Sequence, residues 1–184
     1  MAHGLNVRWK GRREHMFDKV GEFDSAEEIN RAAAAQKAEG DDEAVMGIAM
    51  ENGIDKEDAK DYLDGIVGEL TTPLIAALGK LKAEKEDLKL AGVLSDWVDE
   101  LNTMCTESPE FALAVRRKGK DLAGYMALTV ESGYKNRAVV DRRIVERTAT
   151  IKRIAGTHEF AIGIPDKKTR RELAREYYLG KETE

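Results

Sequence analysis

The spacing of apolar residues between Phe111 and Val130 constrains the fold of this chain more than any other stretch. Apolar side chains recur there close to one face of a 3.6-residue helix, which is the pattern of a helix buried against a core. Ser108 is a good N-cap residue, and Pro109 at the first helical position gives up a donor that has no partner there. The sequence therefore predicts a central core helix. Its predicted buried residues are Phe111, Val115, Leu122, Met126 and Val130.

Four cations interrupt this predicted helix, and we call them the basic ridge: Arg116, Arg117, Lys118 and Lys120. At 100° per residue, Arg116, Arg117 and Lys120 project within about a 100° arc beside the apolar face. Lys118 points elsewhere. A solvated helix face is one interpretation, because charge beside an apolar stripe is common on surface helices. Contact with nucleic acid or another anionic partner is the alternative.

A second core helix is predicted over 90–105, LAGVLSDWVDELNTMC, because its apolar residues also follow one helical face. The linker from Thr106 to Ser108 is short, so the two core helices should form an antiparallel hairpin. Cys105 is the only cysteine, which excludes an internal disulfide and a cysteine-based zinc site. The residues predicted to face the core are Leu90, Leu94, Trp97, Val98, Leu101, Met104 and Cys105.

Capping residues predict three short helices before the middle of the chain. Ser25 and Glu28 fit a capping box, alanines with high helix propensity follow, and Gly40 supplies the left-handed residue that ends the first helix. The second helix ends near Met50, and the third begins after an N-cap at Asp55.

The second and third of these helices have the spacing of a helix-turn-helix, with Gly53 at the turn. Five carboxylates lie on the third helix, and we call them the acidic face: Asp55, Glu57, Asp58, Asp61 and Asp64. Only Lys56 and Lys60 oppose them, so placing this helix against DNA phosphates would be repulsive. Two interpretations avoid that repulsion: a purely structural helical hairpin, and a docking surface for a basic protein partner.

The amino-acid composition of the sequence changes after Gly133. Val, Ile and Thr become frequent, and a Gly156-Thr157 turn separates two alternating apolar pieces, which predicts a small β-hairpin. Asp166 then starts an amphipathic helix that ends at Gly180. The predicted fold class is mainly α, a bundle-like helical domain with a C-terminal hairpin and helix as an α+β appendage. The predicted boundaries are a leader at 1–15, a helical domain at 16–133 and the appendage at 134–184.

Residues 1–15 show neither helical periodicity nor caps. We interpret them as a disordered or added leader outside the fold. A short basic segment that binds nucleic acid is the alternative, because four cations surround Trp9.

Charge is distributed unevenly along the chain. Residues 16–110 carry 9 Lys and Arg against 24 Asp and Glu, a net charge of −15, whereas residues 111–184 carry 17 against 10, a net charge of +7. Such a split steers basic partners toward one region and acidic partners toward the other. With 35% charged residues and several amphipathic helices, the sequence also permits a homodimer.

The sequence offers little material for catalysis. It contains no P-loop, no nucleophile elbow and no pair of histidines at metal-ligand spacing, and His158 is the only histidine beyond residue 15. We therefore expect no enzyme, no metal site and no cofactor. No apolar run is long enough to span a bilayer, and no secretory signal precedes the fold, so the cytoplasm is the expected location.

Residues Met16 to Gly180 resemble a family of small proteins encoded on mobile elements and phages of gut Firmicutes. The stretches that carry the resemblance are FDSAEEINRAAAAQKAEGD, ENGIDKEDAKDYLDG, TTPLIAALGKLK, LSDWVDEL, AVRRKGKDLAGYMA and the closing REYYLG. Some members are anti-CRISPR proteins, which inhibit the type II RNA-guided CRISPR effector nuclease in the cytoplasm of the bacterial host. The resemblance implies a partner that consists of this nuclease with its guide RNA, and inhibition by stoichiometric binding.

The uneven charge distribution suggests a physical mechanism for such inhibition. A type II effector holds its guide–target heteroduplex in a positively charged channel, so the acidic region could occupy a surface meant for phosphates. The basic end could instead contact guide RNA or DNA. The competing hypothesis is a nucleic-acid-binding accessory protein of a conjugative or mobile element, which would bind through the basic residues from Arg116 to Arg175.

Overall fold

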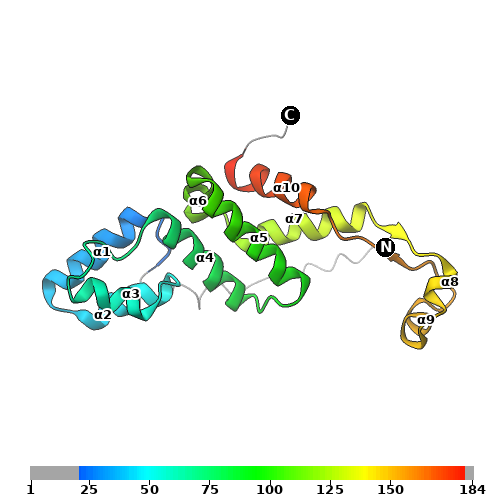
Figure 1. Ribbon diagram of the computed structural model, residues 1–184, viewed down its shortest axis with the longest axis horizontal. Coiled ribbons are helices and arrows are strands. Elements are labelled where there is room, and N and C mark those ends of the chain that lie inside the picture. Colours follow the sequence, from blue (N-terminus) through cyan, green and yellow to red (C-terminus); the bar gives the residue numbers. More distant parts are fainter. Residues whose placement is uncertain (1–20, 181–184) are drawn as a thin grey trace, which may run out of the picture. The chain divides into compact units, whose positions relative to one another are not determined.

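The structure, a computed structural model, describes residues 21–180 (Figure 1). The predicted leader at 1–15 lies outside the described residues. Within them the chain is mainly helical, with one small antiparallel sheet near its C-terminal end, and the predicted fold class is confirmed. The elements are α1 Ala26–Glu39, α2 Asp42–Glu51, α3 Lys56–Leu63, α4 Pro73–Asp87, α5 Val93–Glu107, α6 Pro109–Arg116, α7 Leu122–Lys135, β1 Ala138–Val139, α8 Arg142–Val145, α9 Ala149–Ala155, β2 Ala161–Ile162 and α10 Lys167–Leu179.

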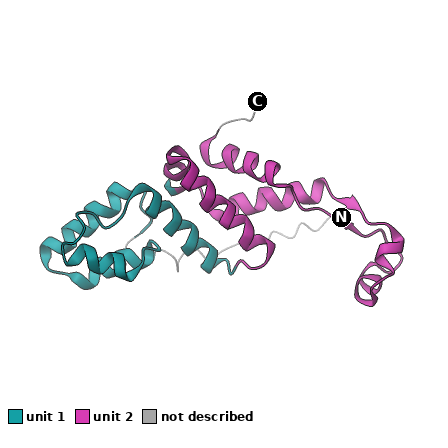
Figure 2. Ribbon diagram, viewed as in Figure 1, with its two compact units in different colours: residues 1–89, 116–118 teal, residues 90–115, 119–184 magenta. Residues whose placement is uncertain are grey.

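The chain divides into two compact units (Figure 2). The described part of unit 1 comprises residues 21–89 and 116–118, and that of unit 2 comprises 90–115 and 119–180. The chain therefore passes from unit 2 into unit 1 for three residues and then returns. This division falls after Lys89 rather than at the expected boundary after Gly133.

The three predicted N-terminal helices are confirmed, and their caps explain where they begin and end. The Ser25 hydroxyl accepts a hydrogen bond from the Glu28 N–H at 3.2 Å, and Gly40 ends α1 in the left-handed conformation with φ of 77°. The Asp41 carboxylate accepts from the Ala44 N–H at 2.9 Å and thereby caps α2. Asp55 precedes α3 in an extended conformation, as predicted for an N-cap residue, but its side chain makes no capping hydrogen bond.

These helices enclose the apolar core of unit 1. In the predicted helical hairpin, Ala49 and Ala59 are fully buried, and Ile54 and Tyr62 are almost so. Burial of such side chains is the main stabilising contribution to a small unit of this kind. The buried residues of the cluster are Ala26, Ile29, Ala33, Val45, Ile48, Ala49, Ile54, Ala59, Tyr62, Leu70 and Ala76.

Two glycines bring the turn between α2 and α3 directly against α4. A Cβ placed on Gly53 would lie 2.2 Å from the carbonyl oxygen of Gly79, and one placed on Gly79 would lie 2.2 Å from the carbonyl oxygen of Asn52. Gly53 also has φ of 68°, which favours glycine on conformational grounds alone. This close approach fixes the orientation of α3 and its carboxylates relative to α4.

The core of unit 2 is formed by α5, α6, α7 and α10. Tyr178 of α10 packs edge-on against the Phe111 ring, with the ring centres 5.5 Å apart, and it also contacts the Tyr125 ring. Leu94 is half-buried rather than buried. The predicted core residues that the structure does bury are Trp97, Val98, Leu101, Met104, Cys105, Phe111, Val115, Leu122 and Met126.

The prediction of one continuous helix from Phe111 to Val130 is wrong. The helix ends at Arg116 and a new one begins at Leu122, because Gly119 takes φ of 79° and the Asp121 carboxylate caps α7 by accepting from the Gly124 N–H. Val130, which was expected to be buried, is 51% exposed.

The predicted β-hairpin is correct only at its base. Two residues of β1 pair with two of β2, with Ala138 opposite Ile162, and the chain between them forms α8 and α9 instead of strands. The Asp141 carboxylate accepts from the Arg143 N–H and starts α8, and Gly156 ends α9 rather than forming a hairpin turn. We call residues 137–164 the arm.

The arm is anchored to the rest of unit 2 at its base. A Cβ on Gly163 would lie 1.7 Å from the carbonyl oxygen of Gly133, so the end of the arm crosses α7 in direct backbone contact. Beyond it, α10 begins after the Asp166 cap and ends at left-handed Gly180, as predicted. In Figure 1 the ribbon places α8 and α9 at the end of the arm, away from α5 and α10.

Candidate functional site

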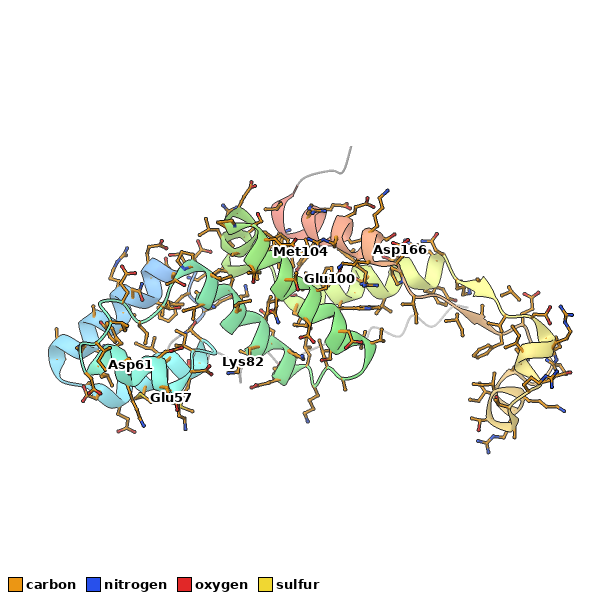
Figure 3. All side chains as sticks on the ribbon, viewed as in Figure 1. Glu57, Asp61, Lys82, Glu100, Met104 and Asp166 are labelled. Atoms are coloured by element: carbon orange, nitrogen blue, oxygen red, sulfur yellow. The ribbon has the colours of Figure 1, made fainter. Side chains whose placement is uncertain are left out.

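The acidic face lies on α3 and its two flanking residues, as the sequence predicted. Glu57, Asp61 and Asp64 fall within one narrow arc of a helix that advances 100° per residue, and Asp58 lies beside them. Ala59 and Tyr62 point to the opposite side and are buried in unit 1. Figure 3 labels Glu57 and Asp61 on this helix.

Four of the five carboxylates are exposed to solvent. Asp55, Glu57, Asp58 and Asp64 are exposed, and Asp61 is half-buried. Glu57, Asp58 and Asp64 are therefore available to a partner without any rearrangement of the fold. Their number on a short helix produces a concentrated negative potential, which favours a cationic surface and repels nucleic acid phosphates.

Two lysines border the acidic face without neutralising it. Lys82 of α4 pairs with Asp55 at 2.7 Å, and this hydrogen bond is the main reason that the pKa of Lys82 is raised. Lys37 of α1 donates to the Tyr62 carbonyl and lies over the Tyr62 ring. Both lysines stabilise the position of α3, and Glu57, Asp58 and Asp64 have no ion pair within the described part of the chain.

The basic ridge is not the continuous exposed surface that the sequence suggested. Arg116 is only 1% exposed, because the helix ends there and its side chain enters unit 1. Its Nη2 donates to the Asn52 Oδ1 at 2.7 Å. Burial lowers the pKa of the Arg116 guanidinium, and the carboxylates of Glu22 and Glu84 oppose that shift. Arg116 is thus a structural residue of unit 1, and its proposed role in an exposed contact is corrected.

The other three ridge cations lie in different surroundings. Arg117 is exposed. The backbone N–H of Lys118 donates to Asp24 at 2.8 Å, and its ammonium lies 3.8 Å from Glu28, so this residue is tied to the start of α1. Lys120 belongs to unit 2, where its ammonium lies over the Tyr177 ring at 4.7 Å.

A buried ionic cluster in unit 1 was not found from the sequence. Lys80, 1% exposed, donates to Glu22 at 3.1 Å and to the Arg117 carbonyl at 2.8 Å, and its ammonium lies 3.9 Å from Glu84. The spacing of Lys80 and Glu84 is typical of an exposed helical ion pair, so nothing local distinguishes it. The cluster holds residues 116–118 against α4.

Cys105 and His158, two residues of types used in catalysis, lie in different surroundings. Burial raises the pKa of the Cys105 thiol to about 12, which keeps it protonated and a poor nucleophile. His158 is exposed on the arm. Within residues 21–180 no three metal-ligating side chains gather as a candidate metal site. No helix among these residues has the length and apolar character needed to cross a membrane.

Comparisons with known proteins do not identify the chain. No protein-family model matches it, and neither a curated protein nor a solved structure was found to match.

Proposed function

We propose that this protein inhibits the type II RNA-guided CRISPR effector nuclease by binding it stoichiometrically, without chemistry, in the cytoplasm of a bacterial host. The acidic face is the proposed docking surface. The partner is the effector with its guide RNA, and no cofactor takes part.

The observation that carries this proposal is the exposure of Glu57, Asp58 and Asp64 on one rigidly held helix. Their carboxylates are solvated and unpaired among the described residues, while Ala59 and Tyr62 fasten the helix to its core. A type II effector binds its heteroduplex in a positively charged channel and reads a short adjacent DNA motif through arginines. A preformed row of carboxylates can take the place of phosphates on such a surface.

A second candidate function rests on the cations of the arm. Arg147, Lys152 and Arg153 are exposed and have no ion pair among the described residues, so they could contact phosphates. This supports the alternative of a nucleic-acid-binding accessory protein of a mobile element. The acidic face has no role in that alternative, and this separates the two experimentally.

The test is co-elution with the purified effector–guide complex, compared with binding to the guide RNA or DNA alone. We expect a complex with the effector that weakens as salt rises, because exposed charges are screened over about 8 Å at physiological ionic strength. Changing Glu57, Asp58 and Asp64 to Lys should abolish it. Asp61 is left unchanged because it is half-buried.

The matched control reverses three exposed carboxylates of unit 2, Asp96, Glu131 and Glu176, and so makes the same change in net charge. It should bind the effector as the unmutated protein does. Binding to nucleic acid without the effector, unaffected by the acidic-face variant, would instead favour the accessory protein.

A further inference from the structure

The arm leaves most of its large apolar side chains exposed. Within residues 137–164 only Val145 and Ala155 are buried. A pair of two-residue strands and two short helices cannot form a stable core of their own. The large aliphatic side chains that the arm leaves exposed are Val139, Ile144, Ile154, Ile162 and Ile164, each more than half exposed. Such a concentration of exposed apolar side chains marks an interaction surface.

The arm is also basic. It carries 6 Lys and Arg against 3 Asp and Glu, a net charge of +3. Arg142 pairs with Glu146 and Arg143 pairs with Asp141 inside the arm. Its unneutralised cations, as far as the described residues go, include Arg147, Lys152 and Arg153. A partner surface should therefore be both apolar and acidic.

An open groove lies at the base of the arm, between the end of α7 and β2. Its volume is about 440 Å³, and it combines aromatic and aliphatic side chains with one cation, Arg137, whose guanidinium lies 4.2 Å from the centre of the Tyr134 ring. An apolar side chain fits this lining, which carries one cation, Arg137, and one carboxylate, Glu159. The lining residues are Val130, Tyr134, Arg137, Glu159, Phe160, Ala161 and Gly163.

Unit 1 offers a surface with the complementary character. Residues 21–89 carry 8 Lys and Arg against 18 Asp and Glu, a net charge of −10. Directly after the acidic face, Ile66 is 69% exposed and Val67 is 41% exposed, and Met50 of α2 is 56% exposed. Acidic and apolar groups thus follow one another in the segment from Asp55 to Val67.

We infer that the arm of one copy docks on the acidic face of a second copy and on the exposed Ile66 and Val67 that follow it, and that the two contacts are reciprocal. Each chain carries one basic apolar arm and one acidic apolar surface, so two copies can satisfy both at once, which is the condition for a closed dimer. The inference does not rest on the proposed function. Because both use the acidic face, a second copy and an effector would compete for it.

The aliphatic side chains favour a protein occupant over nucleic acid. Single-stranded nucleic acid is bound mainly by aromatic side chains that stack on bases, together with cations along the backbone. The tip of the arm, α8 and α9, presents Ile144 and Ile154 and contains no aromatic residue. Burial of isoleucine side chains against another apolar surface is favourable, because it removes them from water.

The test is a charge exchange between copies, followed by sedimentation velocity across a concentration series. One variant changes Arg147, Lys152 and Arg153 to Glu, and the other changes Glu57, Asp58 and Asp64 to Lys. The unmutated chain should be a dimer at the upper concentrations. Each variant alone should dissociate with a constant raised by about tenfold or more, since tenfold corresponds to only about 1.4 kcal/mol.

An equimolar mixture of the two variants should restore the dimer as a heterodimer, because the reversed arm of one then meets the reversed acidic face of the other. The control variant changes Lys167, Lys168 and Arg175 to Glu. It reverses the same number of exposed cations as the arm variant, but outside the arm, and should dimerise as the unmutated chain does. Circular dichroism checks that every variant is folded.

Three results would overturn the inference. The first is an unmutated chain that stays monomeric at the highest concentration. The second is a dimer that neither reversal weakens, which would indicate contact between two arms. The third is failure of the mixture to recover the dimer although both variants are folded. If the chain stayed monomeric and bound RNA or DNA through the arm, the arm would be a nucleic-acid contact and not a dimer contact. Loss of nuclease inhibition alone would leave the inference intact.

Discussion

The region from α1 to α3 and the arm are both built mainly from helices, yet they differ in what they bury. In the first group, Ile29, Ala49 and Ala59 are completely buried, whereas in the arm Ile144 and Ile154 are each 64% exposed. Capping residues start helices in both regions. This difference shows that capping residues determine where helices begin. The stability of a region depends instead on how much apolar side-chain area is buried there.

The largest expected loss of unfolding free energy comes from disrupting the buried polar contacts of unit 1. Arg116→Ala leaves the Asn52 Oδ1 without its donor and removes a cation from the surroundings of Glu22 and Glu84. Truncation of a completely buried side chain, together with a buried acceptor left unpaired, costs about 3 to 5 kcal/mol of unfolding free energy. Arg117→Ala, at an exposed neighbouring position, should change it by only about 0.5 kcal/mol. Equal effects in urea denaturation would place the Arg116 side chain in solvent.

The next prediction compares the loss of unfolding free energy from an isoleucine truncation in α1 with that from one in the arm. Ile29→Ala removes a completely buried side chain and should cost about 2 to 5 kcal/mol. Ile154→Ala, on the arm, should change the unfolding free energy of the monomer by about 0.5 kcal/mol or less, since that side chain is 64% exposed. Urea denaturation at a concentration where the protein is monomeric measures both. A large loss from Ile154→Ala alone would mean that the arm has a core of its own.

A pair of glycines tests the packing that orients the acidic face. Both Gly53 and Gly65 have positive φ, so alanine at either costs about 1 to 2 kcal/mol in backbone strain. Only at Gly53 does the new Cβ collide with the Gly79 carbonyl, and Gly65 faces open space. Gly53→Ala should therefore lose a further 1 to 3 kcal/mol or so, the usual cost of overpacking. Equal midpoints in thermal denaturation of the two variants would contradict that contact.

A dependence of stability on alkaline pH should arise in the helical core of unit 2 rather than in the arm. Burial raises the pKa of Cys105 from its ordinary 9.0 to about 12 and that of Tyr125 from 10.0 to about 12. Above pH 9 the unfolded chain therefore loses these protons before the folded chain does, and stability falls as pH rises toward 12.

Urea midpoints measured between pH 8 and 11 or so would follow this fall, and Cys105→Ala should make it shallower because one of the two groups is then absent. A midpoint that rises over the same range, or a slope that the variant leaves unchanged, would contradict the burial of these groups.

Much of the fold follows from the sequence because it is encoded locally. Ser25 and Asp166 each accept a backbone hydrogen bond within three residues, and both helix starts were predicted. The exposure of Glu57 and Asp58 was predictable for a related reason, because the helical spacing places Ala59 and Tyr62 on the opposite side.

Other features depend on distant contacts that no local pattern reveals. Arg116 is buried because Asn52, 64 residues earlier, receives its hydrogen bond, and a helical pattern cannot indicate that partner. Between Val139 and Ala161, frequent Val and Ile favoured strands, but the chain forms α8, which the Asp141 carboxylate caps, and then α9. Over such short segments, strand propensity is a weak guide.

The most direct test of the central claim is a cleavage titration. A fixed amount of effector–guide complex would receive target DNA and rising amounts of the unmutated chain, the acidic-face variant with Glu57, Asp58 and Asp64 changed to Lys, or the unit 2 control. We predict that cleavage stops once the unmutated chain or the control is equimolar with the effector, and continues with the variant. Cleavage at full rate beside an excess of the unmutated chain, or equal inhibition by the variant, would contradict the claim.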